Sequence, residues 1–328
     1  MTTDYYRNEF NLTCLTSIIS KMKAKIWEYN GIDKVPIDVT NVKVRDGVEL
    51  IPERAFQYCS QLVSIDIPDS VRMIGSGAFH FCTSLQSIKL PPLIRYIEYI
   101  TFRDCRSLRS VQLFNSQLTE IGTYAFYNCT SLKSINFPPA LKYIYLYAFS
   151  GCVSLTTLKL PPYISYMGDR SFCDCTSLTS ILIPNVSCSI QKNSFEGCTS
   201  VTSIQFENPR TDSFFGDKEL KFLVDIIKCC PQIAKRACID KSFLPLHFVL
   251  TTNLRYKYEE VDIIVKAYPE ALSIPDPKFH LYPFLLAACS FSQISAWSYL
   301  DNELEIFECV YNLLREAPWA LCFLIERK

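Results

Sequence analysis

A repeat of 23 residues runs through the middle of the chain and limits the folds that it can adopt. Seven phenylalanines recur at spacings of 23, 23, 24, 23, 23 and 23 residues, and a cysteine follows each of them three positions later. The pairs are Phe56 and Cys59, Phe79 and Cys82, Phe102 and Cys105, Phe126 and Cys129, Phe149 and Cys152, Phe172 and Cys175, and Phe195 and Cys198. A period this short and regular predicts a solenoid, in which each coil packs only against its neighbours.

Each repeat carries apolar residues at spacings that turn them inward from a short strand. In the segment 82–91 these are Leu85, Ile88 and Leu90, and Pro91 ends the strand because proline cannot donate to a β-ladder. The other triplets are Leu62/Ile65/Ile67, Leu108/Val111/Leu113, Leu132/Ile135/Phe137, Leu155/Leu158/Leu160, Leu178/Ile181/Ile183 and Val201/Ile204/Phe206. A return arm adds Ile74, Ile97, Ile121, Ile144, Met167 and Ile190. With Phe79, Phe126, Phe149, Phe172, Cys82, Cys129, Cys152 and Cys175, they predict one continuous core beneath parallel strands.

One coil is longer than the rest. Ile121 follows Leu113 by eight positions where the other coils have seven, and Phe114 and Asn115 replace the proline. The simplest interpretation is a bulge at the loop edge that leaves the core undisturbed. A contact site at this position is the alternative.

The segment Ile74 to Pro91 resembles the BspA-like, or Treponema-type, leucine-rich repeat. That family's consensus runs Ile-Gly-x-x-Ala-Phe-x-x-Cys-x-x-Leu-x-x-Ile-x-Leu-Pro, and the likeness extends over residues 42–206. The resemblance implies a solenoid used for binding, often in microbial surface adhesins. Those adhesins carry export signals or anchors, whereas the residues after Met1 lack the charged-then-apolar plan of a secretory signal and no apolar run approaches membrane-span length. We therefore expect a cytoplasmic or nuclear protein without a membrane span.

Bulk composition agrees with an intracellular binding protein. Lys plus Arg equals Asp plus Glu, 33 against 33, so no basic excess points to nucleic acid or an anionic membrane. The chain has only 9 glycines, which argues against glycine-rich phosphate loops. Seven of the 16 cysteines fall in one column of the repeat. An odd number in one column favours buried, reduced thiols over a disulfide framework.

Two positions of each strand face outward on the predicted concave side. The first is uniformly small and polar: Ser64, Ser87, Ser110, Ser134, Thr157, Ser180 and Ser203. The second varies in charge and size: Asp66, Lys89, Gln112, Asn136, Lys159, Leu182 and Gln205. A partner-specific surface varies in this way, and so does an ordinary solvated face. The second column supplies our candidate partner-binding residues.

A basic and aromatic pattern occurs on the return arm. Arg72, Arg95 and Lys142 share one column, with Tyr96, Tyr143 and Tyr166 beside it. Such a pattern can contact phosphates and stack on bases. Residues 41–207 nevertheless hold 14 Lys/Arg against 12 Asp/Glu, a net charge of +2 (14 − 12), and tyrosines at solenoid spacing pack on one another. We therefore disfavour nucleic acid and expect a protein partner of unknown identity.

The two flanks do not follow the repeat. Leu12, Leu15, Ile19, Met22 and Ile26 have helical spacing, which predicts an amphipathic helix. A helix or an irregular strand here could cap the open end of the solenoid, and an extension that binds a partner helix is the alternative. We divide the chain into an N-terminal cap (1–35), a solenoid (36–207) and a helical region (208–328).

The helical region contains phrases that recur 38 residues apart, and Pro269 is predicted to end a helix over 259–268. The phrase Leu244-Pro245-Leu246-His247 resembles the Thr-Pro-Leu-His phrase of ankyrin repeats. The resemblance implies stacked helix pairs, with Pro245 opening a helix and His247 in a structural hydrogen bond.

No catalytic pattern stands out. None of the three histidines has a ligand or triad spacing, His80 occupies a variable position that we expect to face outward, and no nucleotide-binding or nucleophile motif occurs. The sequence thus predicts an α/β repeat protein, a leucine-rich solenoid with short parallel strands followed by an all-α ankyrin-like domain. Its predicted function is a non-enzymatic protein-interaction scaffold without cofactors or metal. An extracellular adhesin-like protein is the first alternative, and an enzyme whose site is assembled from distant residues is the second.

Overall fold

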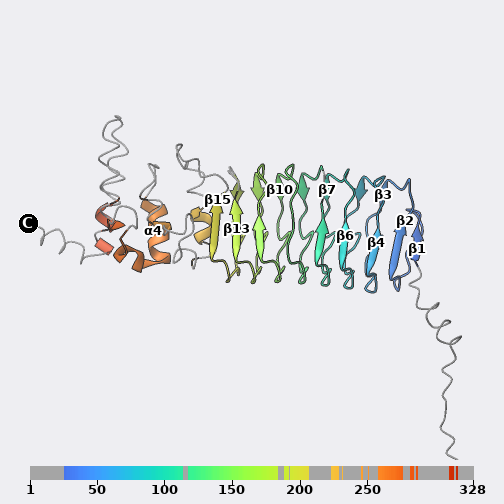
Figure 1. Ribbon diagram of the computed structural model, residues 1–328, viewed down its shortest axis with the longest axis horizontal. Helices are drawn as coiled ribbons and strands as arrows, with labels where there is room; N and C mark the ends of the chain where they lie inside the picture. Colours follow the sequence, from blue (N-terminus) through green and yellow to red (C-terminus); the bar gives the residue numbers. More distant parts are fainter. Residues whose placement is uncertain are drawn as a thin grey trace, which may run out of the picture.

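A stack of parallel rungs makes up residues 26–206 of the computed structural model, with helices beyond the last rung (Figure 1). The structure describes residues 26–113, 117–183, 188–191 and 193–206. In the C-terminal third it describes 223–228, 231, 245–246, 250, 258–275, 281–283, 286, 310–313 and 315–316. The predicted solenoid of about seven coils is therefore confirmed.

Longer strands form one side of each coil, which we call the long-strand face. They are β1 (Ile26–Tyr29), β2 (Asn41–Val44), β4 (Ser64–Asp66), β6 (Ser87–Lys89), β8 (Ser110–Gln112), β11 (Thr157–Lys159), β13 (Ser180–Ile183) and β15 (Ser203–Phe206). They pair in parallel in the orders β1-β2-β4, β6-β8 and β11-β13-β15. Residues 134–136, the matching segment of the coil between β8 and β11, lie outside any strand, although Leu132 and Ile135 stay buried as the predicted continuous core requires.

Two-residue strands form a second side, the short-strand face. They are β3 (Leu50–Ile51), β5 (Met73–Ile74), β7 (Tyr96–Ile97), β9 (Glu120–Ile121), β10 (Tyr143–Ile144), β12 (Tyr166–Met167) and β14 (Ser189–Ile190). Strands β7, β9, β10, β12 and β14 pair as one parallel sheet, with Ile97 in register with Ile121 across the longer coil. The additional residue therefore leaves the core in register, as predicted, while residues 114–116 lie outside the described part of the chain.

The third side, the turn side, surrounds each core phenylalanine. The backbone N–H groups of Arg54, Phe56 and Tyr58 donate to carbonyls of the next coil at 3.0, 2.8 and 2.8 Å. The positions two before and two after each phenylalanine have positive φ: Arg54, Tyr58, Gly77, Phe81, Ile100, Asp104, Tyr124, Asn128, Tyr147, Gly151, Arg170, Asp174, Asn193 and Gly197. This backbone region costs a residue with a Cβ about 1–2 kcal/mol, and the ladder between coils offsets that cost.

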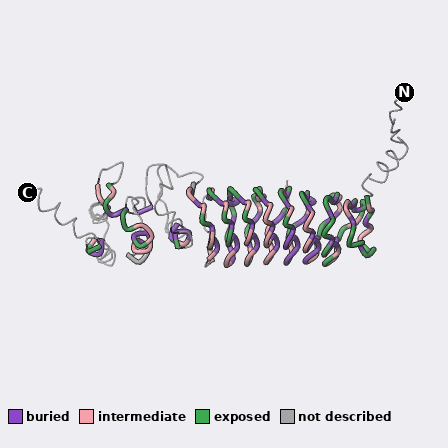
Figure 2. Tube along the Cα trace, turned by 90° about the horizontal axis from the view of Figure 1, so that it is seen from below, coloured by how far each residue is buried: buried purple, intermediate pink, exposed green. Residues whose placement is uncertain are grey.

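The phenylalanines stack through the centre of the solenoid. Ring centroids of successive residues from Phe56 to Phe195 lie 5.2, 5.3, 5.1, 5.0, 5.1 and 5.6 Å apart, and every one of these rings is fully buried. Neighbouring planes differ by 12° at most, as expected for offset-stacked rings. The ring separation nearly matches the β-strand spacing of about 4.8 Å, so one dimension serves both interactions. Figure 2 shows the buried segments recurring from coil to coil.

The cysteine column forms a second buried ladder. From Cys82 onward, each thiol donates to the carbonyl oxygen of the phenylalanine in the previous coil: Cys82 to Phe56 and Cys105 to Phe79 at 3.1 Å, and Cys152 to Phe126 at 3.4 Å. The first thiol of the column, Cys59, donates to the carbonyl of Pro36. All seven column cysteines are buried free thiols. Burial raises the pKa of Cys59 to about 11 and that of Cys152 to about 12. It also raises the pKa values of Cys82, Cys105 and Cys129.

The predicted N-terminal helix is wrong at Ile26, its last residue. Ile26 lies in β1, which pairs in parallel with β2 in the register Ile26 to Asn41, and its side chain is exposed. The buried ring of Tyr29 packs edge-on against Phe56 with centroids 5.0 Å apart, so β1 continues the core of the solenoid by one rung. Ile26 therefore belongs to a strand and not to the predicted helix, because pairing with β2 satisfies the backbone hydrogen bonds of residues 26–29. The remaining helix residues, Leu12, Leu15, Ile19 and Met22, lie outside the described residues.

Helices follow β15 at the end of the stack opposite β1 (Figure 1). Residues 223–228 are helical, and their buried Leu223, Val224, Ile226 and Ile227 join the same apolar cluster as the solenoid core. Helix α4 (Tyr258–Ala267) precedes a 3-10 helix, η2 (Pro269–Ser273). The proline therefore ends α4 as predicted and begins η2. Residues 310–313 and 315–316 are helical, and Pro245 is helical and buried, whereas His247 lies outside the described residues.

Replacing Leu132 with aspartate tests the burial of the strand positions. Leu132 is fully buried, so the substitution places an unpaired carboxylate in the core, and we expect the free energy of unfolding to fall by about 4 kcal/mol or more. Chemical denaturation measures the change. Lys133→Asp, at the exposed neighbouring position, is the matched control and should fall by less than about 0.5 kcal/mol. Equal losses in the two variants would contradict the assigned direction of the side chains.

The cysteine ladder predicts sensitivity to alkali. The unfolded chain loses thiol protons above pH 9, the ordinary thiol value, whereas the folded chain keeps them because burial raises the pKa values. The stabilisation is complete below pH 9 and is lost as the pH rises through the folded-state values. Each such thiol then lowers the free energy of unfolding by about 1.4 kcal/mol per pH unit.

Denaturation curves at increasing pH, under reducing conditions, measure the slope. A Cys129→Ser/Cys152→Ser variant keeps the two hydrogen bonds to carbonyls and removes both titrations. Its slope should be shallower by about 3 kcal/mol per pH unit. Parallel slopes for parent and variant would show that these thiols ionise alike in both states.

Candidate interaction surfaces

The second outward position of the long strands forms one column, as the sequence predicts. Strand register aligns Lys89 with Gln112 and places Lys159 beside Leu182, which in turn aligns with Gln205. Asp66, Lys89, Gln112, Asn136 and Lys159 are exposed, and Leu182 is half-buried. This arrangement gives a column whose side chains differ from coil to coil on a rigid support.

The same register adds a member that the sequence analysis did not propose. Lys43 of β2 aligns with Asp66 and is exposed. The alternation of Val42, Lys43 and Val44 in the sequence indicates a strand in which Lys43 faces outward. That coil lacks the phenylalanine that marks the other coils. In the neighbouring column, Ser64 Oγ donates to Asn41 Oδ1 at 2.7 Å. That serine therefore stabilises the adjacent coil.

Tyrosines gather on and beside the short-strand face. Tyr96 and Tyr99 are each 48% exposed, whereas Tyr143, Tyr145 and Tyr166 are half-buried. Ring centroids of Tyr143 and Tyr145 lie 6.2 Å apart, and those of Tyr145 and Tyr166 lie 6.0 Å apart. The hydroxyl of Tyr145 donates to Glu120 Oε2 at 3.1 Å. The sequence predicted that Tyr96, Tyr143 and Tyr166 pack on one another, whereas Tyr143 and Tyr166 both pack on Tyr145 and Tyr96 is exposed.

Glycines in the column of Tyr145 make room for this arrangement. A Cβ on Gly122 would lie 2.7 Å from the carbonyl oxygen of Ile97, and one on Gly168 would lie 2.7 Å from the carbonyl carbon of Tyr145. The coils approach too closely at these two positions for a side chain. Tyr145 therefore stands between two glycine gaps in its column.

Arginines and tyrosines interact on the turn side. Arg103 lies over the rings of Tyr124 and Tyr127, with 5.5 and 5.1 Å from its Cζ to the ring centroids. Arg170 donates to the hydroxyl of Tyr147 at 2.7 Å and to Glu196 Oε2 at 2.9 Å. These two hydrogen bonds raise the pKa of the Arg170 guanidinium. The groups hold one another in place, so this surface is ordered before any partner arrives.

His80 does not face outward as expected. It is 8% exposed, and Gln57 Nε2 lies 3.1 Å from its Nδ1. Burial and then the charge of Arg103 lower the pKa of His80, which keeps the imidazole neutral. The aromatic neighbours Tyr58 and Phe81 cover it, with ring centroids 5.9 and 4.4 Å away. Contact with these rings therefore buries a side chain whose variable position in the repeat predicted exposure.

A buried carboxylate lies near this histidine. Asp104 accepts hydrogen bonds from Asn128 Nδ2 at 2.7 Å, Arg106 Nη2 at 3.3 Å and Arg103 Nε at 3.4 Å, and its side chain is 6% exposed. The hydrogen bond from Asn128 joins adjacent coils, whereas Arg103 and Arg106 contact the carboxylate within its own coil. Its partners stabilise its charge and give it a structural role.

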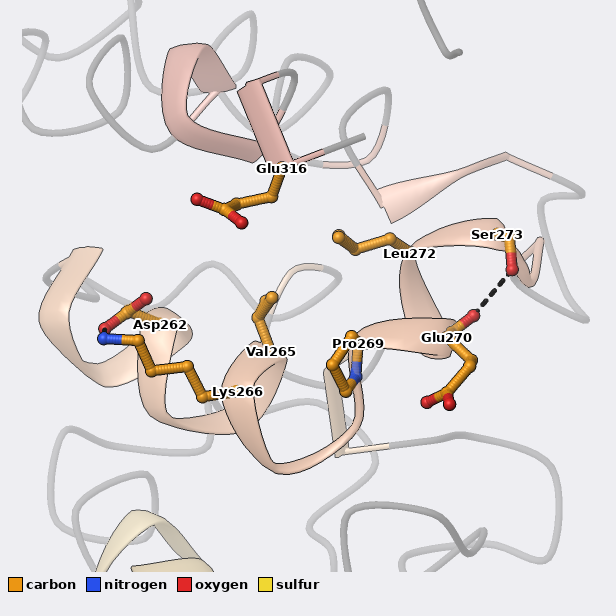
Figure 3. Close-up of a pocket in the computed structure, with 8 residues that line it drawn as sticks. All are labelled: Asp262, Val265, Lys266, Pro269, Glu270, Leu272, Ser273 and Glu316. Carbon is orange, nitrogen blue, oxygen red and sulfur yellow. Dashed lines mark hydrogen bonds and ion pairs between the residues drawn. The ribbon is translucent and has the colours of Figure 1, made fainter. Parts of the chain in front are cut away.

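The helical region contains a cleft of about 360 Å³ between α4, η2 and the 315–316 segment (Figure 3). Its lining residues are Asp262, Val265, Lys266, Pro269, Glu270, Leu272, Ser273 and Glu316. Asp262 pairs with Lys266 at 2.6 Å, and Ser273 Oγ donates to the Glu270 carbonyl at 2.7 Å. This lining has no histidine or cysteine, and within the described residues no three metal-ligating side chains meet.

Comparison with known proteins identifies the repeat. The family model described as the BspA type leucine rich repeat region matches residues 35–122 and 113–218, with six copies. The chain belongs to the BspA-type leucine-rich repeat family. The resemblance inferred from the repeat sequence is therefore confirmed for this region. BspA-type proteins are generally non-enzymatic interaction or surface proteins.

Solved structures of other leucine-rich repeat proteins are similar to this BspA-type chain. A leucine-rich repeat protein from T. pallidum is 32% identical over 50% of this chain and 77% of that one, with a TM-score of 0.43. A leucine-rich cell surface protein from Faecalibacterium prausnitzii is 22% identical over 53% and 61% of the two chains, with a TM-score of 0.34. One from Bacteroides ovatus is 24% identical over 57% and 64%, with a TM-score of 0.32. No curated protein matches the chain.

The matched region of this BspA-type protein ends at residue 218, before the described helices. The ankyrin-like organisation of the C-terminal third therefore stays a prediction. Among the helices that the structure describes, none has the length and apolar character needed to cross a membrane.

The Asp104 contacts generate a stability prediction. Asp104→Ala leaves Asn128 Nδ2 and two guanidinium groups without their acceptor, and we expect the free energy of unfolding to fall by about 2–3 kcal/mol. Urea denaturation measures the loss. Asp66→Ala, at an exposed carboxylate, is the control and should change stability by no more than about 0.5 kcal/mol. A loss at Asp104 no larger than that at Asp66 would refute the role of these contacts.

Proposed function

We propose that this protein is a non-enzymatic scaffold that binds a protein partner through the long-strand face and its adjoining loops. The observation that carries the proposal is one column of unlike, mostly exposed side chains supported by parallel strands. Its described members are Lys43, Asp66, Lys89, Gln112, Asn136, Lys159 and Leu182, and Gln205 follows in register.

Rigidity supports this function because binding then orders few groups. The strands beneath the column pair in parallel within three sheets and lie on a fully buried core, so association does not have to order the backbone. The column mixes lysines with an aspartate and amides, a pattern that selects a partner by charge complementarity. Family membership supports a binding role in general.

The flanking regions complete the proposal. We place the interaction module in residues 36–207, with 1–35 closing its first edge and an ankyrin-like helical region, 208–328, closing its last. The buried Val224 and Ile227, which join the apolar cluster of the solenoid, support the second closure. Seven buried thiols, each a free thiol in one column, support residence in a reducing compartment, the cytoplasm or nucleus.

Charge reversal on the long-strand face tests the function. Affinity purification with mass spectrometry should recover a partner with the parent chain and lose it with Lys89→Glu/Lys159→Glu. Arg72→Glu/Arg95→Glu, which makes the same change of charge on the short-strand face, should retain that partner. A partner that survives the first variant, or that both variants lose, would rule out the long-strand column as its binding site.

A further inference from the structure

We infer that the short-strand face is a second docking surface, which binds an acidic, amphipathic α-helix of a partner protein. The surface comprises Met73, Tyr96, Tyr143, Tyr145 and Tyr166, together with the basic column Arg72, Arg95 and Lys142. Tyr99 and Leu146 border it toward the turn side, where Tyr99 packs edge-on against Tyr124 with ring centroids 6.3 Å apart. It lies on a different sheet from the long-strand column, so the inference stands independently of the function proposed above.

Apolar and aromatic area is exposed on this face and at its border. Met73 is 50% exposed, Tyr96 and Tyr99 are each 48% exposed, and Leu146 is 37% exposed. The matching outward positions of the long strands hold serines, one threonine, charged or amide groups and two apolar residues, the exposed first residue of β1 and the half-buried Leu182. Tyrosine supplies large contact area together with a hydroxyl donor, and it is enriched among the residues that dominate binding energy at protein interfaces.

The basic column beside the tyrosines defines the charge of the partner. Arg72, Arg95 and Lys142 are exposed, and within the described residues none of the three forms an ion pair. Other arginines of the solenoid do pair with carboxylates, as Arg103 does with Asp104 and Arg170 with Glu196. The short-strand face therefore presents positive charge that a partner's carboxylates complement.

The carboxylates of the face itself do not supply this complement. Glu120 accepts a hydrogen bond from Tyr145, and Glu53 pairs with Arg54 at 3.4 Å. Glu98 is half-buried in the coil of Tyr99. Glu49 is exposed in the basic column, one coil before Arg72, and marks the end of the positive stretch.

Packing of the tyrosine rings favours a protein over a nucleic acid. The rings of Tyr143 and Tyr145 stack with a 16° angle between planes, and Tyr166 packs on Tyr145 from the next coil. These contacts occupy part of each ring, and the hydroxyl of Tyr145 is already bonded to Glu120. Single-stranded nucleic acid binds by laying bases on free aromatic faces. Side chains of a protein instead pack on edges and accept from hydroxyls.

The spacing of the coils favours a helix that lies along the solenoid axis. Arg72 and Arg95 are one coil apart, and Arg95 and Lys142 are two coils apart, which corresponds to about 4.8 and 10 Å. One helical turn advances about 5.4 Å, so carboxylates at i, i+3 or i+4, and i+10 or i+11 meet these three residues. Side chains on one face of an extended strand recur every 6.6 Å or so and fall out of step.

Selection from random peptides displayed on phage tests the inference on the full chain. Selected peptides should carry Asp or Glu and apolar residues at three- and four-residue steps. A synthetic peptide of the selected sequence, followed by fluorescence anisotropy, should bind about tenfold or more weakly to Arg72→Glu/Arg95→Glu/Lys142→Glu. The matched control, Lys43→Glu/Lys89→Glu/Lys159→Glu, changes charge equally on the long-strand face and should bind like the parent.

A second variant keeps the test decisive if triple charge reversal impairs folding. Tyr96→Ser/Tyr99→Ser removes two exposed rings without a change of charge and should also weaken the peptide about tenfold, while its melting temperature matches that of the parent.

Peptides without carboxylates, or with carboxylates in strict alternation, would overturn the inference. So would equal loss in the long-strand control, or displacement of the peptide by a short oligothymidylate, which would identify a nucleic-acid surface. Loss of the acidic peptide only with the short-strand variants leaves the long-strand proposal untouched, so the two proposals fail separately.

Discussion

The distance between neighbouring coils is the constraint on which the rest of this structure depends. Parallel strands require about 4.8 Å, and the phenylalanine rings stack at 5.0 to 5.6 Å. Backbone hydrogen bonds cross this gap on the long-strand, short-strand and turn sides alike. A single coil satisfies neither its hydrogen bonds nor its core, so stability arises between coils, and every position of the repeat becomes a column running along the axis.

This constraint also explains the choice of cysteine in the core column. The carbonyl of each core phenylalanine accepts the N–H of the cysteine three residues later, and for most coils it also accepts the thiol of the following coil's cysteine, at 3.1 Å for Cys82 and Cys129. A valine of similar volume fills the space without this second contact. The thiol thus links adjacent coils at their tightest point, and its burial ties the fold to a protonated, reduced sulfur.

Much of this arrangement can be predicted from the sequence, because residues that share a column recur at a fixed interval along the chain. The phenylalanine, cysteine and aliphatic positions, the family and the outward direction of Lys89 and Lys159 all follow from residues 23 apart. Features within a single coil do not. His80 occupies a variable position of the repeat yet lies buried because the rings of Tyr58 and Phe81 cover it. Ile26 has helical spacing yet pairs with β2. The exposed tyrosine face was underestimated because ring packing and exposure depend on the glycines of neighbouring coils.

Columns that the fold leaves unconstrained are where partner recognition can evolve without loss of stability. Core columns are uniform, since a single large or charged substitution disturbs two neighbouring coils. The two outward columns discussed above differ in kind: lysines, an aspartate and amides are interspersed along the long strands, whereas Arg72, Arg95 and Lys142 share a sign and adjoin apolar area. The mixed charges of the long-strand column fix the position of a partner along the solenoid axis. The positive charges beside the tyrosines attract a partner's acidic face, and the tyrosines then pack against that face. A solenoid of this kind can therefore carry two specificities at once, because substitutions in one outward column do not contact the other.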